Sequence, residues 1–521
     1  MNDIKNWLPE FRVAAESDRE LLKYFFKTKI VDSTYNSHRW MILGRKGTGK
    51  TAIYEFLKSS KPEDTNGYFN IALSFKDYPW PIHKIYKESM EGELTSYQKS
   101  WHYLFTIQFI AKLIQIKEMN KEKLSAELKA VKNYIEQIYG NPNPSIIEVI
   151  KTKFKRLDKI KLPGIETDAI SAHIGEISFE EISEDQILKN KLRSNAFNLL
   201  NYFQKILIDN IQPYKILISL DQLDENWLRT EMTEYAKILI NLINVCQSIN
   251  NSNKFNGSVK IVLFLRTDIF DTLVFNDKNK IFQDAAIEIR WDDESLNEMY
   301  FERIKSYKPR DVELDYSLKT NSIFEVKNVR HGATPFRHIL RRSFYRPRDI
   351  IVFINNVRDI HQPSKTGLFT SKDIYQAEKA VSNNIFQELI DEWSNQKPDI
   401  EKYLKVLQNI GYQTFYIDDF VEKYNQQFDS VDIADINEAL RFLFENSIIG
   451  QKVNVNWSYS CSKPGIQIDF DKPFHVNSGL KDRLVLTESR TTSSAQSLDL
   501  ELKRLTLEEF NFDDFIESDE E

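Results

Sequence analysis

The sequence predicts an α/β fold in which a parallel β-sheet carries a phosphate-binding loop near the amino end of the chain. A glycine-rich motif lies between a short apolar run and a helical stretch, and further apolar runs of strand length recur downstream. Helical stretches separate these runs. Strands that alternate with helices are typical of a parallel sheet covered by helices.

The size and composition of the chain limit its class. A chain of 521 residues is too long to fold around a single hydrophobic core. Its content of 41% hydrophobic and 28% charged residues is typical of globular proteins. Apolar runs such as Ile261 to Leu265 are too short to span a bilayer, and the first residues lack a signal-peptide pattern. Because only Cys246 and Cys461 are present, a disulfide framework and a cysteine-based zinc site are excluded. We therefore expect a cytoplasmic protein without membrane attachment.

The elements before the motif and around it follow from periodicity. Residues 16–30 place two pairs of large apolar side chains at helical spacing, which predicts a helix. Apolar residues predict a first strand at Trp40 to Leu43 and a second at Tyr68 to Phe75, with a helix at Thr51 to Lys58 between them. The glycine-rich segment therefore connects a strand to a helix.

The segment GRKGTGKT matches the pattern G-x-x-x-x-G-K-[ST]. Its glycines permit a backbone that side chains would block, so that successive N–H groups can surround a phosphate at a helix N-terminus. The lysine supplies a positive charge for the β- and γ-phosphates, and the threonine offers a hydroxyl to Mg²⁺. We expect a nucleoside triphosphate, ATP, with Mg²⁺ here. The predicted binding residues are Gly44, Arg45, Lys46, Gly47, Thr48, Gly49, Lys50 and Thr51.

A carboxylate at the end of a later strand is the predicted partner of this loop. Residues Ile216 to Leu220 are apolar except for Ser219, which predicts a strand buried on both faces. Asp221 follows directly, where ligands of open α/β sheets gather, and we expect it to hold Mg²⁺ together with Thr51. The alternative is that Asp221 only caps a following helix.

Three residues after Asp221 are candidates for activating the attacking water. Asp224 and Glu225 follow within one turn, and either could polarise a water, with Glu225 favoured. Gln222 could orient the water but could not abstract its proton, so we expect slow hydrolysis. A further core strand, Val259 to Leu265, is followed by Arg266, a candidate sensor of the γ-phosphate. The alternative for Arg266 is an ion pair with Asp268 or Asp271.

The rest of the chain divides into further predicted parts. Helical patterns between the second strand and Asp221 predict an insertion, and residues 398–486 predict three helices followed by a hairpin of Ser447 to Val455 with Ile466 to Phe470, which is a winged-helix arrangement. A helix is predicted to begin at Pro347. The predicted domains are a P-loop core (1–94 and 205–293), a helical insertion (95–204), a helical lid (294–385), a winged-helix domain (386–490) and a flexible acidic tail (491–521).

These motifs resemble the AAA+/STAND side of the P-loop NTPases, and bacterial members of that group found in anti-phage defence loci in particular. The resemblance rests on GRKGTGKT, ILISLDQLDE, VLFLRTDIFD and YRPRDIIVFIN. It implies that Arg346 or Arg348 acts as a second sensor at the start of a lid helix. It also implies a switch that couples ATP to an effector or regulatory protein, with homo-oligomer formation open. The membrane helices of the related KAP group are missing.

Charge patterning leaves the partners open. Eight acidic residues and no basic ones occupy Glu508 to Glu521, and without these eight, 69 of the 77 acidic residues remain to balance 70 basic ones. The tail is either a solvated segment or a ligand for a basic groove. Two basic clusters, at residues 151–161 and 337–348, could contact nucleic acid by counterion release. A DNA-binding initiator or loader is therefore the alternative function, although a nearly neutral body argues against a dedicated DNA binder.

Overall fold

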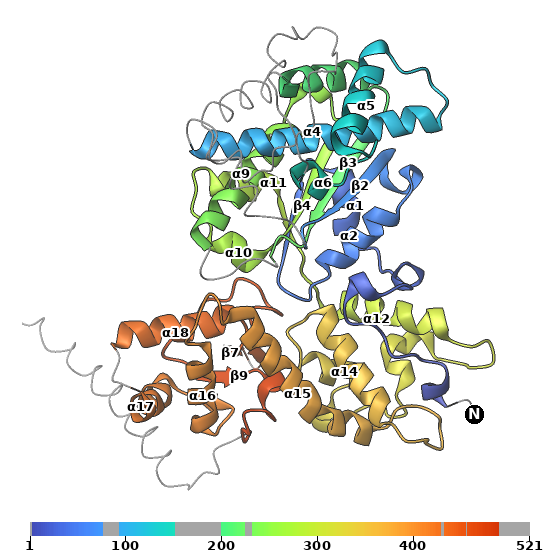
Figure 1. Ribbon diagram of the computed structural model, residues 1–521. Coiled ribbons are helices and arrows are strands. Elements are labelled where there is room, and N and C mark those ends of the chain that lie inside the picture. Colours follow the sequence, from blue (N-terminus) through green and yellow to red (C-terminus); the bar gives the residue numbers. More distant parts are fainter. Residues whose placement is uncertain are drawn as a thin grey trace, which may run out of the picture. The chain divides into compact units, whose positions relative to one another are not determined.

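A computed structural model describes most of the chain as two compact units (Figure 1). The first unit comprises Met1–Phe336 with Tyr345–Asp373, and the second comprises Arg337–Phe344 with Ile374–Glu521. The described residues are 3–76, 93–151, 199–224, 232–428, 432–454 and 456–488. The predicted acidic tail lies outside them, and the predicted domain boundaries stay predictions.

A five-stranded parallel sheet forms the centre of the first unit. Its strands are β1 (Met41–Gly44), β2 (Tyr68–Ser74), β3 (Lys215–Asp221), β4 (Val259–Arg266) and β5 (Ala286–Glu288), in the order β2-β3-β4-β1-β5. The strands predicted from the sequence are confirmed. Gly44 pairs with Arg266, and Ser74 pairs with Asp221. The carboxyl ends of four strands therefore meet at one edge of the sheet.

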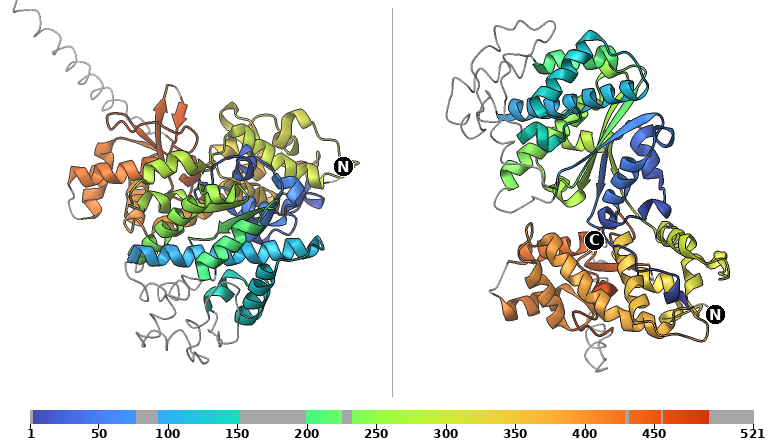
Figure 2. Two further views of the ribbon diagram at one scale, coloured as in Figure 1. Left: turned by 90° about the horizontal axis from the view of Figure 1, so that it is seen from above. Right: turned by 45° about the vertical axis from the view of Figure 1, so that its right-hand side comes forward.

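Helices cover both faces of this sheet (Figures 1 and 2). On one face, α1 (Lys29–Asn36) and α2 (Lys50–Ser59) share a core with Leu217 and Phe264. On the other, α4 (Glu93–Met119) and α9 (Met232–Asn250) share a core with Ile216. Because β3 sends alternate residues into both cores, it is buried on both faces, as predicted. Further elements of this unit are α5 (Ala126–Tyr139), α6 (Ile146–Lys151), a helix at 199–210, α10 (Thr267–Thr272), α11 (Lys278–Ala285), η4 (Pro62–Thr65) and η7 (Asn253–Phe255).

The predicted helical insertion is partly a layer of the core. Helix α4 belongs to the same hydrophobic cluster as β3, with Phe105 and Trp101 fully buried. Its loss would therefore expose the face of the nucleotide-binding sheet. Residues 152–198, in the remainder of that segment, lie outside the described residues.

The lid begins after the sheet. It contains α12 (Asp293–Tyr307), α14 (Pro347–Ile360), and the start of α15 (Ser371–Trp393), with η8 (Tyr316–Ile323), η9 (Arg330–Gly332) and α13 (Pro335–Leu340) between the first two. Pro347 is at the first position of α14, which confirms the predicted start of that helix. Asp292 caps α12 through the backbone N–H of Ser295 at 2.7 Å.

The helix predicted at residues 16–30 is wrong. The segment instead forms short 3-10 turns, η2 (Ala15–Ser17) and η3 (Leu21–Lys23), after η1 (Ile4–Asn6), and α1 begins only at Lys29. Residues 3–25, here called the N-terminal strap, lie in an irregular path along the lid. Leu21 and Tyr24 are buried while Leu22 is half exposed, so contacts with the lid, and not helical periodicity, determine which side chains turn inward.

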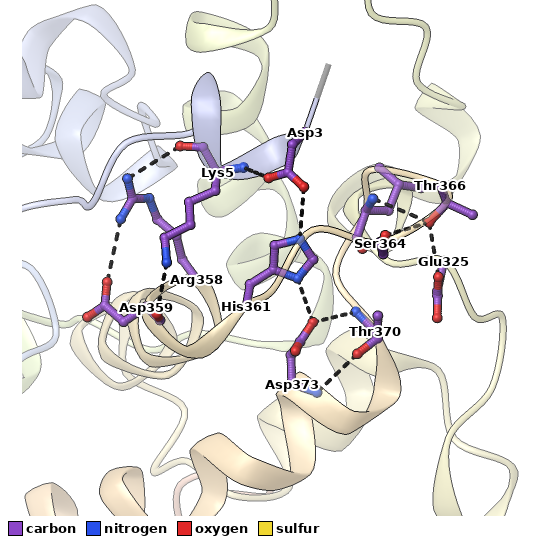
Figure 3. A network of polar contacts seen from close by, with 11 residues as sticks. Asp3, Lys5, Glu325, Arg358, Asp359, His361, Ser364, Thr366, Thr370 and Asp373 are labelled. Carbon is purple, nitrogen blue, oxygen red and sulfur yellow. Dashed lines mark hydrogen bonds and ion pairs between the residues drawn. The ribbon is translucent and has the colours of Figure 1, made fainter. Parts of the chain in front are cut away.

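Polar contacts fasten the strap to the lid. Asn355 of α14 accepts a hydrogen bond from the backbone N–H of Phe11 at 3.1 Å and donates one to its carbonyl at 2.8 Å. Arg358 donates to the Leu8 carbonyl at 2.7 Å. Figure 3 shows His361 between two carboxylates, with Nδ1 at 2.7 Å from Asp373 and Nε2 at 3.4 Å from Asp3. The strap is therefore held by backbone and side-chain bonds along one helix.

The second unit has the predicted winged-helix arrangement. Three helices, α16 (Ile400–Ile410), α17 (Ile417–Gln427) and α18 (Ile433–Glu445), accompany an antiparallel sheet of β6 (Thr414–Phe415), β7 (Ile449–Val453), β8 (Asn456–Ser458) and β9 (Phe474–Val476), followed by η10 (Ser478–Leu480). The strand order is β6-β9-β7-β8. The predicted hairpin partner was wrong: β7 pairs with β8, and residues 466–470 form no strand. The chain turns at Asn454, whose φ of 58° closes a tighter hairpin.

Candidate nucleotide-binding site

The backbone of residues 44–51 has the conformation that the motif predicts. Gly47 and Gly49 have φ of 81° and 99°, which side chains rarely adopt, and Gly49 directly precedes α2. A Cβ on Gly44 would lie 2.5 Å from the Thr48 hydroxyl, which itself donates to the Arg45 carbonyl at 2.8 Å. Trp291 donates to the Thr48 carbonyl at 2.9 Å. The loop is therefore fixed from within and from the lid side, with the N-terminus of α2 at its end.

Lys50 is held inside this loop. Its ammonium donates to the carbonyls of Gly44 at 2.7 Å and Arg45 at 3.0 Å. Burial lowers the pKa of Lys50, while the negative charges of Asp224 and Asp221 act in the opposite direction. A positive charge that already sits against the cradle is in position for a bound phosphate.

Asp221 is the last residue of β3 and is almost fully buried, with 3% of its surface exposed. Burial raises its pKa to about 6, although a hydrogen bond from the Thr51 hydroxyl acts to lower it. Its Oδ2 is buried without a hydrogen-bond partner. A buried carboxylate oxygen without a partner is costly unless a ligand supplies one.

These residues fit Mg²⁺. A hydroxyl and one carboxylate oxygen are hard ligands, and Mg²⁺ at such sites takes its remaining ligands from phosphates and water. No cluster of three or more histidine, cysteine or acidic side chains occurs in the described ranges, so a metal here would depend on the bound phosphates. Thr51 and Asp221 are the residues that would hold the ion, and that assignment stays a prediction.

The candidates for water activation are only partly described. Gln222 has a positive φ of 63°, and its side-chain oxygen accepts a hydrogen bond from Ser74, which directs the amide toward β2. Asp224 lines the cavity beside the loop, 3.6 Å from a nitrogen of Arg266. Glu225 lies outside the described residues. Its assignment as the base is therefore still a prediction.

Arg266 lies at the end of β4, as predicted, but its guanidinium is engaged. Its Nε and Nη2 donate to the two carboxylate oxygens of Asp268 at 3.1 and 2.7 Å, which is a bidentate pair. This geometry is the alternative that the sequence left open. A γ-phosphate would have to compete with Asp268 for this side chain, and the sensor assignment remains a prediction.

The start of α14 lies directly against the phosphate loop. The backbone N–H of Arg348 donates to the Gly47 carbonyl at 3.4 Å, and the Arg346 guanidinium donates to the Lys46 carbonyl at 3.1 Å. Arg346 is buried and also lies 3.5 Å from Asp349. Arg348 lines the cavity, so it is the better placed of the two for a ligand.

A cavity of about 290 Å³ lies at this loop. The phosphate loop, the end of β3, the lid and the N-terminal strap all contribute to its wall. Sequence reasoning missed the strap and two lid residues, because neither group forms a motif and the two groups are separated by almost the whole core. The missed lining residues are Arg12, Val13, Ala15, Glu16, Asp18, Leu21, Arg303 and Ile351.

Part of the basic cluster at residues 337–348 is paired internally, whereas Arg337 and Arg341 are exposed. In the second unit, His338 lies 2.8 Å and Arg342 lies 3.2 Å from the two carboxylate oxygens of Glu378 on α15. Both side chains are largely buried. The other cluster, at residues 151–161, lies outside the part whose side chains are described. Within the described residues no helix is long and apolar enough to span a membrane.

Comparisons with known proteins give distant similarities. Residues 294–390 match a family model described as a FunZ-associated C-terminal helical domain. An 80.3 kDa protein of Escherichia coli (strain K12) that is assigned to transposon gamma-delta is 22% identical over 431 residues, which are 76% of this chain and 53% of that protein. The chain thus spans about half the length of this relative.

Among solved structures, the Aeropyrum pernix ORC2 protein in ADPNP–ADP complexes is 12% identical, with a TM-score of 0.41, and the match covers 90% of this chain and 96% of that one. The Aeropyrum pernix ORC1 protein in complex with DNA is 10% identical, with a TM-score of 0.34 over 91% and 93% of the two chains. These values are too low to assign a family. The P-loop fold of this chain rests on its own sheet, its loop and the position of Asp221.

Proposed function

We propose that the chain is an ATP-binding and ATP-hydrolysing molecular switch that uses Mg²⁺ and regulates a partner protein. One observation carries the proposal. The buried Oδ2 of Asp221 has no partner, and it lies in a cavity wall together with Thr51 and Lys50, at the open end of a phosphate loop. A metal-bound triphosphate would satisfy all three side chains.

The lid gives the switch its mechanical connection. Because α14 begins against the loop at Gly47, a triphosphate bound there would contact the sheet and the lid at once. Hydrogen bonds to charged groups contribute about 1.5–3 kcal/mol each. Two or three such bonds made in one state only approach the roughly 5.5 kcal/mol needed for a nearly complete population change.

Slow hydrolysis suits a switch. Gln222 occupies the position directly after Asp221, and an amide can orient water but cannot take its proton. We assign the base to Glu225, with Asp224 as the second candidate. ATP would then persist long enough for the bound state to be read by a partner.

The partner is an effector protein, and the anti-phage defence setting that the motifs suggest is one such context. The Escherichia coli relative is assigned to a transposon, which favours a mobile genetic setting. The second candidate function is a DNA-binding initiator or loader, favoured by the winged-helix arrangement of the second unit.

Nucleotide binding and turnover by the full chain test the proposal. We expect micromolar or tighter binding of MgATP, slow release of phosphate, and loss of turnover in Glu225→Gln with binding retained. Sub-micromolar duplex binding that depends steeply on salt concentration and requires ATP would favour the loader. Failure of the unaltered chain to bind MgATP would overturn both.

A further inference from the structure

Arg303 of α12 is a buried cation whose surroundings do not account for its charge. Only 6% of the residue is exposed. Its Nη1 donates to the carbonyl of Met299 at 3.1 Å, one turn earlier on its own helix, while its Nε is buried without a partner. In the described part of the chain no carboxylate lies within ion-pair distance of it, and the charge of Asp18 acts on it only from further away. A buried charge in this condition is costly.

The rings of the N-terminal strap hold the guanidinium in place. Its carbon lies 4.8 Å from the ring centroid of Tyr24 and 5.8 Å from that of Phe11. Tyr24 in turn donates to Asp18 at 2.6 Å, and Asp18 lines the cavity. These contacts fix the position of the cation but leave hydrogen-bond donors unused.

Arg303 also lines the cavity at the phosphate loop. The phosphate end of that cavity is marked by Lys50, Thr51 and Asp221. The aromatic neighbours of Arg303 belong instead to the strap. The strap and the lid add apolar side chains such as Leu21 and Ile351 to the cavity wall, beside the charged side chains Arg12, Glu16 and Asp18. Apolar walls with a few fixed donors suit a flat base and its sugar better than a phosphate.

We propose that Arg303 binds the nucleoside part of the triphosphate, donating hydrogen bonds to acceptor atoms of the base or the ribose. This inference rests on the proposed function, since it requires that residues 44–51 hold the phosphates. It makes the strap and the lid a nucleoside pocket and gives the buried cation its missing acceptors. Arg303 thereby becomes a specificity-determining residue that no motif marks.

Binding of MgATP compared with magnesium tripolyphosphate separates the two ends of the site. In calorimetric titrations of the full chain, we expect Arg303→Met to raise the Kd for MgATP about 10- to 100-fold, the loss of one or two charge-assisted hydrogen bonds. The Kd for tripolyphosphate should change less than about twofold. Lys50→Ala should weaken both ligands. Arg303→Lys keeps the charge but loses the planar fork, and it should show the same selective loss with its melting temperature retained.

Arg358→Met is the matched control. Arg358 also fastens the strap, through the carbonyl of Leu8 at 2.7 Å, but it does not line the cavity. If Arg303 only anchors the strap, the two methionine variants should weaken MgATP equally, and that result would overturn the inference. So would an equal loss of MgATP and tripolyphosphate, or no loss of either, in both Arg303 variants.

Two further ligands identify the acceptor. If the Arg303 substitutions weaken binding of MgATP but not of MgdATP, the contact is to the ribose 2′-hydroxyl. With MgGTP, an effect that differs from that on MgATP assigns it to the base. If the unaltered chain binds tripolyphosphate but the Arg303 variants retain full MgATP affinity, the inference fails while the proposed phosphate site stands. If the unaltered chain binds neither ligand, the proposed function itself fails.

Discussion

At the scale of single residues, Asp221 combines two properties that conflict in the absence of a ligand. It must be ionised to bind a metal, yet it is buried beside the sheet core with one oxygen unpartnered. Its pKa of about 6, against an ordinary value of 3.8, means that the folded protein holds a proton more tightly than the unfolded chain does. Burial of Asp221 therefore reduces stability, as expected if this residue is a metal ligand.

Asp221→Asn should stabilise the protein without nucleotide and weaken its binding of MgATP. The amide removes a buried charge whose raised pKa corresponds to about 3 kcal/mol at pH 7.5, as an order of magnitude. We expect a melting temperature several degrees higher at pH 7.5, measured by differential scanning fluorimetry. Magnesium should then tighten ATP binding far less than in the unaltered chain. A lower melting temperature would contradict a raised pKa.

The pH dependence follows with a definite sign. Because the folded pKa lies above the unfolded one, the unfavourable contribution of Asp221 is complete above about pH 6 and decreases progressively as the pH falls from about 6 to the ordinary pKa of 3.8. The same protonation removes a metal ligand, so the MgATP affinity should fall from pH 7.5 to pH 5.5. The binding curve of Asp221→Asn should be nearly flat over this range, and an equally steep curve would assign the effect to another group.

Lys50→Ala tests the other half of the cradle. Two loop carbonyls now accept from Lys50, and without it no ammonium would reach the β- and γ-phosphates. We expect the affinity for MgATP to fall at least about 100-fold, the loss of charge-assisted bonds. Lys58→Ala, on the exposed end of the same helix and paired with Glu55, should bind like the unaltered chain. Retained affinity in Lys50→Ala would remove the basis of the phosphate site.

At the scale of elements, the core of the site could be predicted and its cover could not. Strands β1 and β3 are local apolar runs followed by the candidate site residues, so the sequence indicated that they meet at one sheet edge. The hydrophobic residues of the strap have neither helical nor strand periodicity. Phe11 and Tyr24 turn inward because they contact a lid that lies roughly 280 residues further along the chain. Likewise, the positions of Arg266 and Asp268 in the sequence did not decide whether Arg266 faces the nucleotide or Asp268. The bidentate pair depends on side-chain geometry that only the structure shows.

The strap should detach when its central fastening is removed. Asn355 is buried and makes both of its hydrogen bonds to the backbone of Phe11, whereas its neighbour Asn356 bonds only within α14, to Val352. Asn355→Ala leaves a buried donor and acceptor of the strap unsatisfied. We expect trypsin to cleave near Arg12 several times faster in Asn355→Ala than in Asn356→Ala, as followed by mass spectrometry.

Nucleotide should reverse that difference. If the strap covers a bound nucleoside, saturating MgATP should slow the cleavage of the unaltered chain and of Asn356→Ala, since binding stabilises the closed strap. Cleavage that is equally fast in both variants and unaffected by MgATP would show that the strap is no part of the nucleotide site.

At the scale of the whole molecule, charge separates the switch from the loader. The formal charge of −7 comes from the acidic end of the chain, and two side chains of the basic cluster, His338 and Arg342, both pair with Glu378. Phosphate contacts by lysine and arginine supply most non-specific DNA affinity. Internal pairing of these two side chains leaves Arg337 and Arg341 as the exposed cations of that cluster, and thus fewer contacts for a duplex.

The wing provides the sharpest test of this difference. Trp457 of β8 stacks on the buried His475 of β9, with ring centroids 4.4 Å apart, and Lys452 of β7 lies over Trp457. Lys452 and Trp457 are paired next to the turn of the β7–β8 hairpin, which is the wing of a winged helix. For a switch, we expect Lys452→Glu to leave duplex binding weak, above about 1 µM at 150 mM salt, and ATP turnover unchanged. A loader would bind more tightly, with a steep salt dependence that Lys452→Glu reduces and Lys423→Glu, on exposed α17, does not. Fluorescence anisotropy of a labelled duplex, with and without MgATP, distinguishes these outcomes. Only in a loader should ATP bound at the phosphate loop change the affinity of the wing for the duplex.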